Sequence, residues 1–171
     1  MRNNYNIPKK FHNKLISIKQ NNDEIISWFF IQSFKSWILL HYNPVDYVLD
    51  GYIFIPLHNI KAYKYDKEEK FKEKVILSNK KPIKNSLSER KSIIKCLYTN
   101  QTTIAIEKKK SRFYVWNITK QKKKSIILQC ITPGGTQWKK RKIKIKDINN
   151  IAFNSDYINC LKNYSDTISS E

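Results

Sequence analysis

Alternation of apolar and polar residues along the chain predicts many short β-strands. The pattern is clearest at Lys142–Lys146, where isoleucines alternate with lysines, so one face of that strand is apolar and the other is basic. Turn-forming pairs such as Asn43-Pro44 and Asp50-Gly51 separate the apolar runs. The expected strands are Leu15–Lys19, Ile25–Phe34, Trp37–Tyr42, Tyr52–Leu57, Ile60–Tyr65, Thr103–Glu107, Arg112–Thr119, Ser125–Ile131, Trp138–Lys146 and Asn149–Phe153.

Helices are expected outside these strands. A helix over 66–77 has a suitable N-cap in Asp66, and Phe71 and Val75, four residues apart, indicate its apolar side. A second helix over 86–98 opens with the capping-box pattern Ser86–Glu89. A third is expected from about 155 to 164.

The apolar pattern also repeats along the chain. When the sequence is shifted by 88 residues without a gap, Trp28 falls on Trp116 and the triplet 38–40 falls on 126–128. We therefore predict a mainly β (α+β) fold made of two diverged copies of a small, bent, antiparallel five-stranded barrel with short flanking helices. The expected divisions are 11–77 (first repeat with a trailing helix), 78–98 (polar linker and connecting helix), 99–164 (second, lysine-rich repeat with a C-terminal helix) and 165–171 (polar tail).

The order of these elements carries a resemblance. The segment WILLHYNPVDYVLDGYIFI, its continuation HNIKAY and the later KIKIKDINNIAF resemble tandem Sm-like small-barrel repeats. They are also similar to uncharacterised bacterial proteins that have a DGY segment before an apolar strand. The resemblance covers most of 15–164 and includes no catalytic residues. It implies a fold, with RNA, DNA or protein binding as its possible uses.

Charge changes this picture most. The 171 residues contain 33 Lys and Arg against 14 Asp and Glu, a formal net charge of +19, which favours an anionic partner. Residues 1–85 contribute 15 basic and 8 acidic side chains, and residues 86–171 contribute 18 and 6. Between Lys108 and Lys146 there are fourteen basic residues and no acidic one. Codon usage of an AT-rich genome also raises lysine content, so composition alone explains part of this excess.

The basic residues of the second copy are the candidate binding site. A lysine surface that neutralises phosphates gives salt-sensitive binding with little sequence specificity, and lysine rather than arginine argues against base-specific contacts. The alternative is a solvated lysine face that only keeps the protein soluble. The candidate nucleic-acid-binding residues are Lys108, Lys109, Lys110, Arg112, Lys122, Lys123, Lys124, Trp138, Lys140, Arg141, Lys142, Lys144 and Lys146, with Trp138 as a stacking residue.

A protein-interaction adaptor is the alternative function. Small barrels expose strand edges that can pair with a strand of another chain, and an acidic protein would also suit the lysines. The segment Trp28, Phe29, Phe30 and Ile31 is apolar on consecutive residues, which a strand with one buried face does not require. These four residues either contact a partner or pack inside the molecule.

Enzymatic chemistry is not expected. His12, His41 and His58 lack metal-ligand spacing to one another or to the three cysteines, and the three glycines of the chain leave no phosphate-cradling loop. We therefore expect no catalytic, cofactor-binding or metal-binding residue, and a cytoplasmic protein with reduced cysteines. The longest apolar run is far shorter than a membrane span, so no span is expected.

Overall fold

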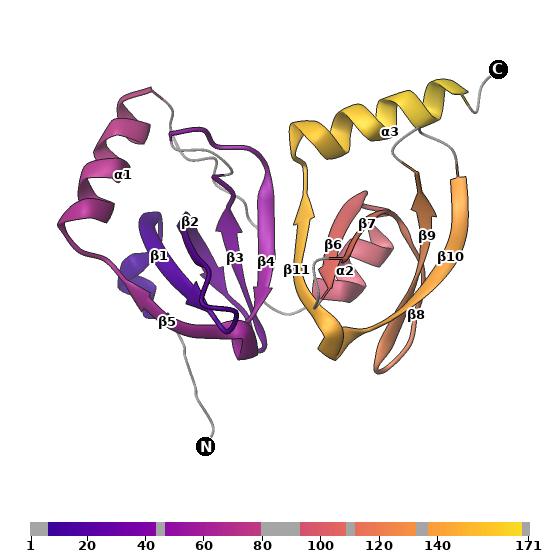
Figure 1. Cartoon of the computed structure of the whole chain (residues 1–171), viewed down its shortest axis with the longest axis horizontal. Helices are drawn as coiled ribbons and strands as arrows, with labels where there is room; N and C mark the ends of the chain where they lie inside the picture. The colour runs from indigo at the N-terminus through magenta and orange to yellow at the C-terminus, as the bar shows by residue number, and fades with distance from the viewer. Residues whose placement is uncertain (1–6, 44–46, 80–92, 109–111, 133–136, 169–171) are drawn as a thin grey trace. The chain divides into compact units, whose positions relative to one another are not determined.

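The computed structural model describes residues 7–43, 47–79, 93–108, 112–132 and 137–168. The chain divides into two compact units, unit 1 (Met1–Leu87) and unit 2 (Ser88–Glu171) (Figure 1). The division falls inside 78–98, the segment expected to link two repeats.

Unit 1 is an antiparallel sheet in the order β5-β1-β2-β3-β4. A short 3-10 helix, η2 (Leu57–Asn59), connects β4 to β5, and another, η1 (Lys9–Phe11), precedes β1. The strands are β1 (Lys14–Gln20), β2 (Ile25–Ser33), β3 (Trp37–His41), β4 (Tyr52–Pro56) and β5 (Ile60–Lys64).

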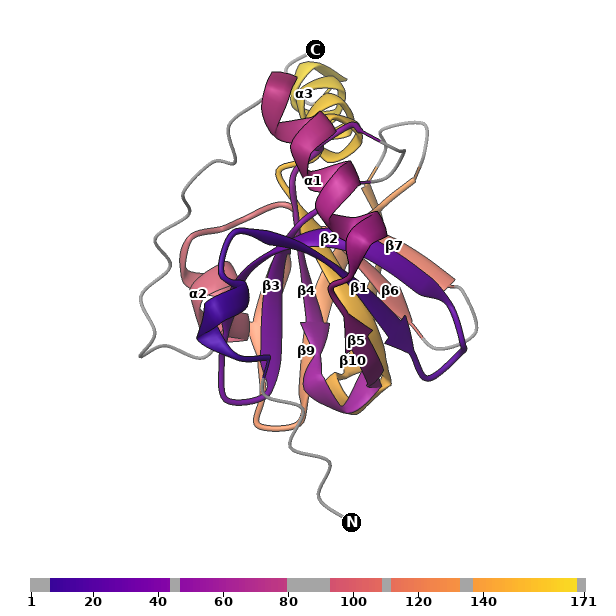
Figure 2. The same cartoon turned by 90° about the vertical axis from the view of Figure 1, so that its left-hand side faces the viewer.

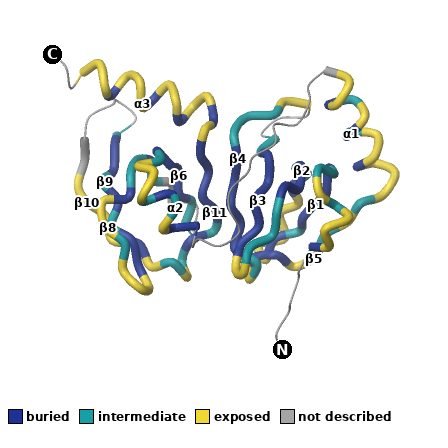
Figure 3. Tube along the Cα trace, turned by 180° about the vertical axis from the view of Figure 1, so that it is seen from behind, coloured by how far each residue is buried: buried dark blue, intermediate teal, exposed yellow. Residues whose placement is uncertain are grey.

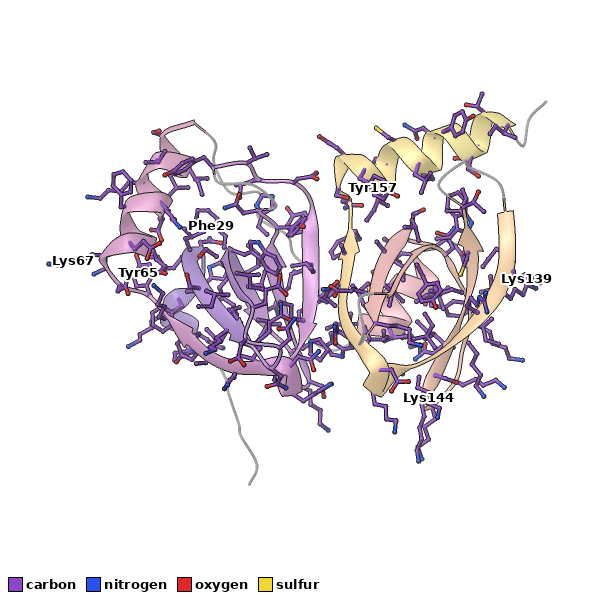
Figure 4. All side chains as sticks on the ribbon, in the orientation of Figure 1. Phe29, Tyr65, Lys67, Lys139, Lys144 and Tyr157 are labelled. Carbon is purple, nitrogen blue, oxygen red and sulfur yellow. The ribbon has the colours of Figure 1, made fainter. Side chains whose placement is uncertain are left out.

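The core of unit 1 forms beneath a helix. Every residue of β3 and β4 is buried, as expected for strands rich in isoleucine and aromatic residues. The helix α1 (Lys67–Asn79) packs against β1 (Figure 2), where Ile76 joins a cluster with Leu15 and Phe29. Phe29 is fully buried in this cluster (Figure 4).

Unit 2 contains two antiparallel sheets, in the orders β11-β6-β7 and β10-β9-β8. The helix α2 (Ile93–Thr99) precedes β6, and α3 (Asp156–Ile168) follows β11. The strands are β6 (Ile104–Lys108), β7 (Arg112–Trp116), β8 (Ile118–Gln121), β9 (Ser125–Ile131), β10 (Gln137–Lys144) and β11 (Ile148–Phe153), with the 3-10 helix η3 (Ile145–Asp147) between β10 and β11.

The strand registers of the two units coincide after a shift of 88 residues. Ile16 pairs with Trp28 in unit 1, and Ile104 pairs with Trp116 in unit 2. The β2–β3, β3–β4 and β1–β5 ladders recur as β8–β9, β9–β10 and β6–β11, and the bulges of β2–β3 and β1–β5 recur in β8–β9 and β6–β11. The counterpart of β2 is divided into β7 and β8 at Trp116, whose φ of 137° lies in the region that favours glycine.

The mainly β class with flanking helices is confirmed, since strands make up 47% of the structure. All ten expected strands are present, and the expected strand 112–119 is two strands, so the described residues form eleven. The expected bent five-stranded barrels are not confirmed, because the described strands form antiparallel sheets and not closed barrels. The short helix η2 redirects the chain from β4 into β5, and β5 then pairs with β1.

The helices differ from expectation in their ends. α3 continues to Ile168, beyond the expected end at 164, so part of the predicted polar tail is helical. Residues 86–92 of the expected second helix lie outside the described residues. Among the residues that the structure describes, no helix is both long and apolar enough to cross a bilayer.

Candidate nucleic-acid interface

One face of the sheet β10-β9-β8 carries four lysines. Directly paired residues in neighbouring strands place their side chains on the same face. Ile127 of β9 pairs with Lys120 of β8 on one side and with Lys142 of β10 on the other. Lys140 and Lys144 lie two residues before and after Lys142, so they share its face. All four lysines are exposed (Figure 3), and Lys144 extends away from the sheet (Figure 4).

Four more lysines lie at the end of this sheet. Residues 122–124 form the turn between β8 and β9, closed by a bond from the Lys122 backbone N–H to the Ser125 carbonyl (2.8 Å). The backbone N–H of Ile145 donates to the carbonyl of Lys124 (3.0 Å), which brings η3 beside this turn. Lys146 therefore lies next to lysines more than twenty positions earlier in the sequence. We call Lys120, Lys122, Lys123, Lys124, Lys140, Lys142, Lys144 and Lys146 the lysine surface; all eight are exposed.

The hairpin between β6 and β7 ends near the same place. Lys108 pairs with Ile148, two residues after Lys146, and with Arg112 of β7. Lys108 is half-buried. Lys109 and Lys110 lie outside the described residues, and nothing is described of the Arg112 side chain. The topology thus brings three basic segments of the chain to one end of unit 2.

One candidate residue, Arg141, does not belong to this face, and a second, Trp138, cannot be assigned to a face. Arg141 pairs with Leu128, so it lies on the opposite face of the sheet from Lys140 and Lys142. There it influences Cys130, where burial raises the pKa of the thiol and the nearby guanidinium partly offsets this. Trp138 lies on β10, but its side chain is outside what the structure describes. Its predicted stacking role stays a prediction.

The charges of the two units are balanced differently. All seven ion pairs between described residues lie in unit 1, and three of them join Lys64 to Asp66, Glu68 and Glu69. The Glu69 carboxylate, followed by that of Glu68, raises the pKa of Lys64. None of the eight residues of the lysine surface is ion-paired with a described carboxylate. Within the described residues, no carboxylate is therefore paired with the positive charge of the lysine surface.

Seven of the eight matching positions of unit 1 are neither lysine nor arginine; the exception is Lys35, which corresponds to Lys123. Lys120, Lys124 and Lys146 correspond, 88 residues earlier, to Gln32, Ser36 and His58. Lys140, Lys142 and Lys144 correspond to Tyr52, Phe54 and Pro56, all in β4. A uniform drift toward lysine codons would act on both units alike, so it does not by itself place the lysines on this part of unit 2.

The apolar segment Trp28–Ile31 is buried, with at most 6% of any of its four residues exposed. The Trp28 Nε1–H donates to the carbonyl of Asn43 (3.0 Å), and its ring lies edge-on to Tyr42. Phe29 packs against Leu15. These contacts, all inside unit 1, favour the packing interpretation of the segment over the partner-binding one.

His41 and the carboxylates of Asp66, Glu68 and Glu69 are held by neighbouring side chains of unit 1. His41 is buried and stacks on Tyr52, with 4.8 Å between ring centroids. Asp66, Glu68 and Glu69 are close enough together to hold a metal ion, but the Lys64 ammonium already lies 3.1–3.5 Å from an oxygen of each. The cation at this cluster is thus supplied by the chain itself.

Sequence reasoning left Lys120 out of the candidate residues. The expected strand ends at Thr119, one residue before Lys120, whereas β8 continues to Gln121 and pairs Lys120 with Ile127. The bulge between Ile118 and Lys120 sets which face Lys120 occupies. The same bulge exists between Phe30 and Gln32 in unit 1. Gln32 corresponds to Lys120 and lies within an expected strand, so the repeat was the signal that could have placed Lys120 in a strand.

Comparison with protein-family models, with curated proteins and with solved structures finds no match to this chain.

Proposed function

We propose that the chain is a tandem of two diverged β units and that unit 2 binds nucleic acid through the lysine surface, without catalysis and with little sequence specificity. The observation that carries the proposal is the convergence of eight exposed lysines, from β8, the β8–β9 turn, β10 and η3, none of them ion-paired with a carboxylate in the part of the chain that the structure describes. A cluster of like charges destabilises a folded protein, and a polyanion relieves that repulsion. Binding releases the counterions of the neutralised phosphates.

Lysine is suited to this task. Its ammonium acts as a point charge toward a phosphate and lacks the planar fork with which arginine reads guanine. The lysine surface contains no arginine. The proposed contacts are therefore to the backbone of the nucleic acid, which positions the ligand but carries no sequence information.

Fluorescence anisotropy with a labelled nucleic acid across a salt series tests the proposal. The variant Lys120→Gln/Lys124→Ser/Lys146→His takes at each position the residue that unit 1 has 88 positions earlier, so each side chain is one that the corresponding site accepts. On duplex DNA, we expect the slope of log K against log salt to decrease by about 2 to 3, at roughly 0.9 per lost phosphate contact.

The matched control removes the same charge from unit 1. Lys67→Gln/Lys70→Gln/Lys74→Gln changes three exposed lysines of α1 and should leave the slope within about 0.5 of the parent value. Circular dichroism checks that both variants are folded. Absence of salt-dependent binding by the folded parent protein would contradict the proposal, and so would an equal loss in both variants.

A further inference from the structure

The lysine surface is a two-dimensional array rather than a line. Neighbouring strands are about 4.8 Å apart, so Lys120 and Lys142, on either side of β9, start roughly 10 Å from each other. Lys140, Lys142 and Lys144 follow one another along β10 at about 6.7 Å per step, which gives a length of roughly 13 Å. The lysines of the β8–β9 turn and η3 extend this array at one end.

No aromatic residue occurs in the cross-strand rows of this face. The rows are Lys120–Ile127–Lys142, Gln129–Lys140 and Ser125–Lys144. Sites for single-stranded nucleic acid combine a positive groove with aromatic side chains on which unpaired bases stack. Ile127 is half-buried between two lysines whose aliphatic stems can cover it, so it offers no flat ring to a base. The described face therefore provides charge without a stacking platform.

A double helix matches this arrangement. It presents two phosphate backbones, with one negative charge per about 1.7 Å of its axis, and keeps its bases stacked inside. Over the roughly 13 Å length of the β10 row, such a ligand offers about eight phosphates on two strands. A single strand presents its phosphates in one row, so it cannot satisfy the β8 and β10 lysines together without wrapping.

We infer that the preferred ligand of unit 2 is double-stranded nucleic acid that lies across β8, β9 and β10, with its phosphates on the lysines of both β8 and β10. This inference rests on the proposed function. The duplex is held by Lys120 on one side of Ile127 and by Lys140, Lys142 and Lys144 on the other. Binding then needs no base to leave its stack.

Anisotropy with a DNA duplex, an RNA duplex and a single strand of matched phosphate number tests this inference on the full chain. At about 0.15 M salt, we expect a duplex to bind at least roughly fivefold more tightly than the single strand. The variant Lys120→Gln/Lys142→Gln removes one lysine from each side of Ile127 and should weaken duplex binding by about 10- to 30-fold. The control Lys67→Gln/Lys74→Gln, on α1, should leave it within about twofold.

The outcomes separate the inference from the proposed function. A single strand that binds as tightly as the duplexes, with Trp138→Ala reducing its affinity, overturns the inference and leaves nucleic-acid binding in place. Poly-glutamate that competes as well as duplex at equal charge overturns it in favour of an acidic protein. No salt-dependent binding of any nucleic acid overturns the proposed function as well. A difference between the DNA and RNA duplexes shows which of the two forms is preferred.

Discussion

Two glutamates determine how α1 attaches to unit 1. Glu73 Oε2 accepts a hydrogen bond from the Leu15 backbone N–H (3.0 Å), and its Oε1 lies 3.1 Å from the Lys14 ammonium. Glu69 accepts from the Ser17 hydroxyl and from the Asp66 backbone N–H (3.0 Å). Both carboxylates are buried, and burial of a charge is tolerated only where such partners exist.

Unit 2 shows that this network is not required by the scaffold. The positions that correspond to Ser17 and Glu73 are Ala105 and Leu161. Replacement of a buried ionic network by apolar residues is often neutral for stability, whereas removal of one member is costly. The polar network therefore gives α1 a defined position on β1 and makes that attachment sensitive to pH.

Glu69→Gln tests this pH dependence. Burial alone would raise the pKa of Glu69, but the Ser17 hydroxyl, Asp66 and the Lys64 ammonium together hold this pKa at about 2. The pKa of Glu69 is lower in the folded state than its ordinary value of 4.5, so the ionised carboxylate stabilises the fold at pH values above 4.5. This contribution is lost as the pH falls toward 2. At pH 7 we expect a loss of about 1–3 kcal/mol in the free energy of unfolding.

Urea unfolding of the parent and Glu69→Gln proteins at several pH values measures the difference. It should shrink between pH 4.5 and the acid limit of the fold. Lys67→Gln, an exposed change on the same helix, is the control and should show a small, pH-independent difference. A Glu69→Gln difference that stays constant from pH 7 down to 3 would rule out the assigned cause.

At the scale of the element, α1 shows where helix periodicity fails. Phe71 and Val75 were expected on its apolar side, but Phe71 is 62% exposed, while Glu69, Glu73 and Ile76 face β1. The cause lies in the sheet: β5 pairs with β1 only from Ser17 onward, so the Leu15 N–H has no strand partner there and takes a carboxylate. The spacing of apolar residues within a helix cannot predict that a neighbouring strand has such an unpaired edge.

The exposed and buried apolar residues of α1 should therefore respond differently to substitution. Ile76→Ala removes a side chain that is 1% exposed and packed against Phe29, and should cost about 2–5 kcal/mol. Phe71→Ser should change stability by no more than about 0.5 kcal/mol, as is usual for exposed positions. Chemical denaturation of both variants measures this. A larger loss for Phe71→Ser would mean that α1 docks through its apolar side after all.

Strands were easier to predict than the site that they build. Alternation over Lys142–Lys146 indicated the exposed lysine face of β10, because the period of a strand is local, although β10 ends at Lys144 and Lys146 lies in η3. The same alternation places Arg141 on the other face, where it lies. The β8–β9 turn contacts η3 through a hydrogen bond between Ile145 and Lys124. This contact depends on the register of the strands, which local alternation does not determine. The lysine surface is therefore a tertiary feature.

At the scale of the whole molecule, the two units share their strand registers but not their charges. Five lysines of unit 1 lie beside carboxylates, whereas unit 2 leaves eight lysines unopposed by described carboxylates. Lysines at such short separations repel one another, and salt screens this repulsion over about 10 Å at 0.1 M. The lysine surface should thus lower the stability of the free protein at low salt, which is the expected signature of a surface retained for binding.

The variant Lys120→Gln/Lys124→Ser/Lys146→His should consequently be more stable than the parent at low ionic strength. We expect an increase in the free energy of unfolding of roughly 0.5–1 kcal/mol at about 0.01 M salt, falling toward zero near 1 M as the charges become screened. Thermal unfolding across a salt series measures it. An increase that persists at 1 M salt would assign the effect to packing and not to charge.

Because the registers coincide, the binding surface should be transferable between units. Gln32→Lys, Ser36→Lys and His58→Lys place the removed lysines at the matching positions of unit 1, none of which is fully buried. In the full chain with Lys120→Gln/Lys124→Ser/Lys146→His, these changes should restore about 1 to 2 of the lost salt slope on duplex DNA, at roughly 0.9 for each recovered phosphate contact. Restoration of less than the full slope is expected because unit 1 has no counterpart of Lys140, Lys142 and Lys144. No recovery at all would mean that charge at these positions is not sufficient, and that β10 is what makes unit 2 the binding unit.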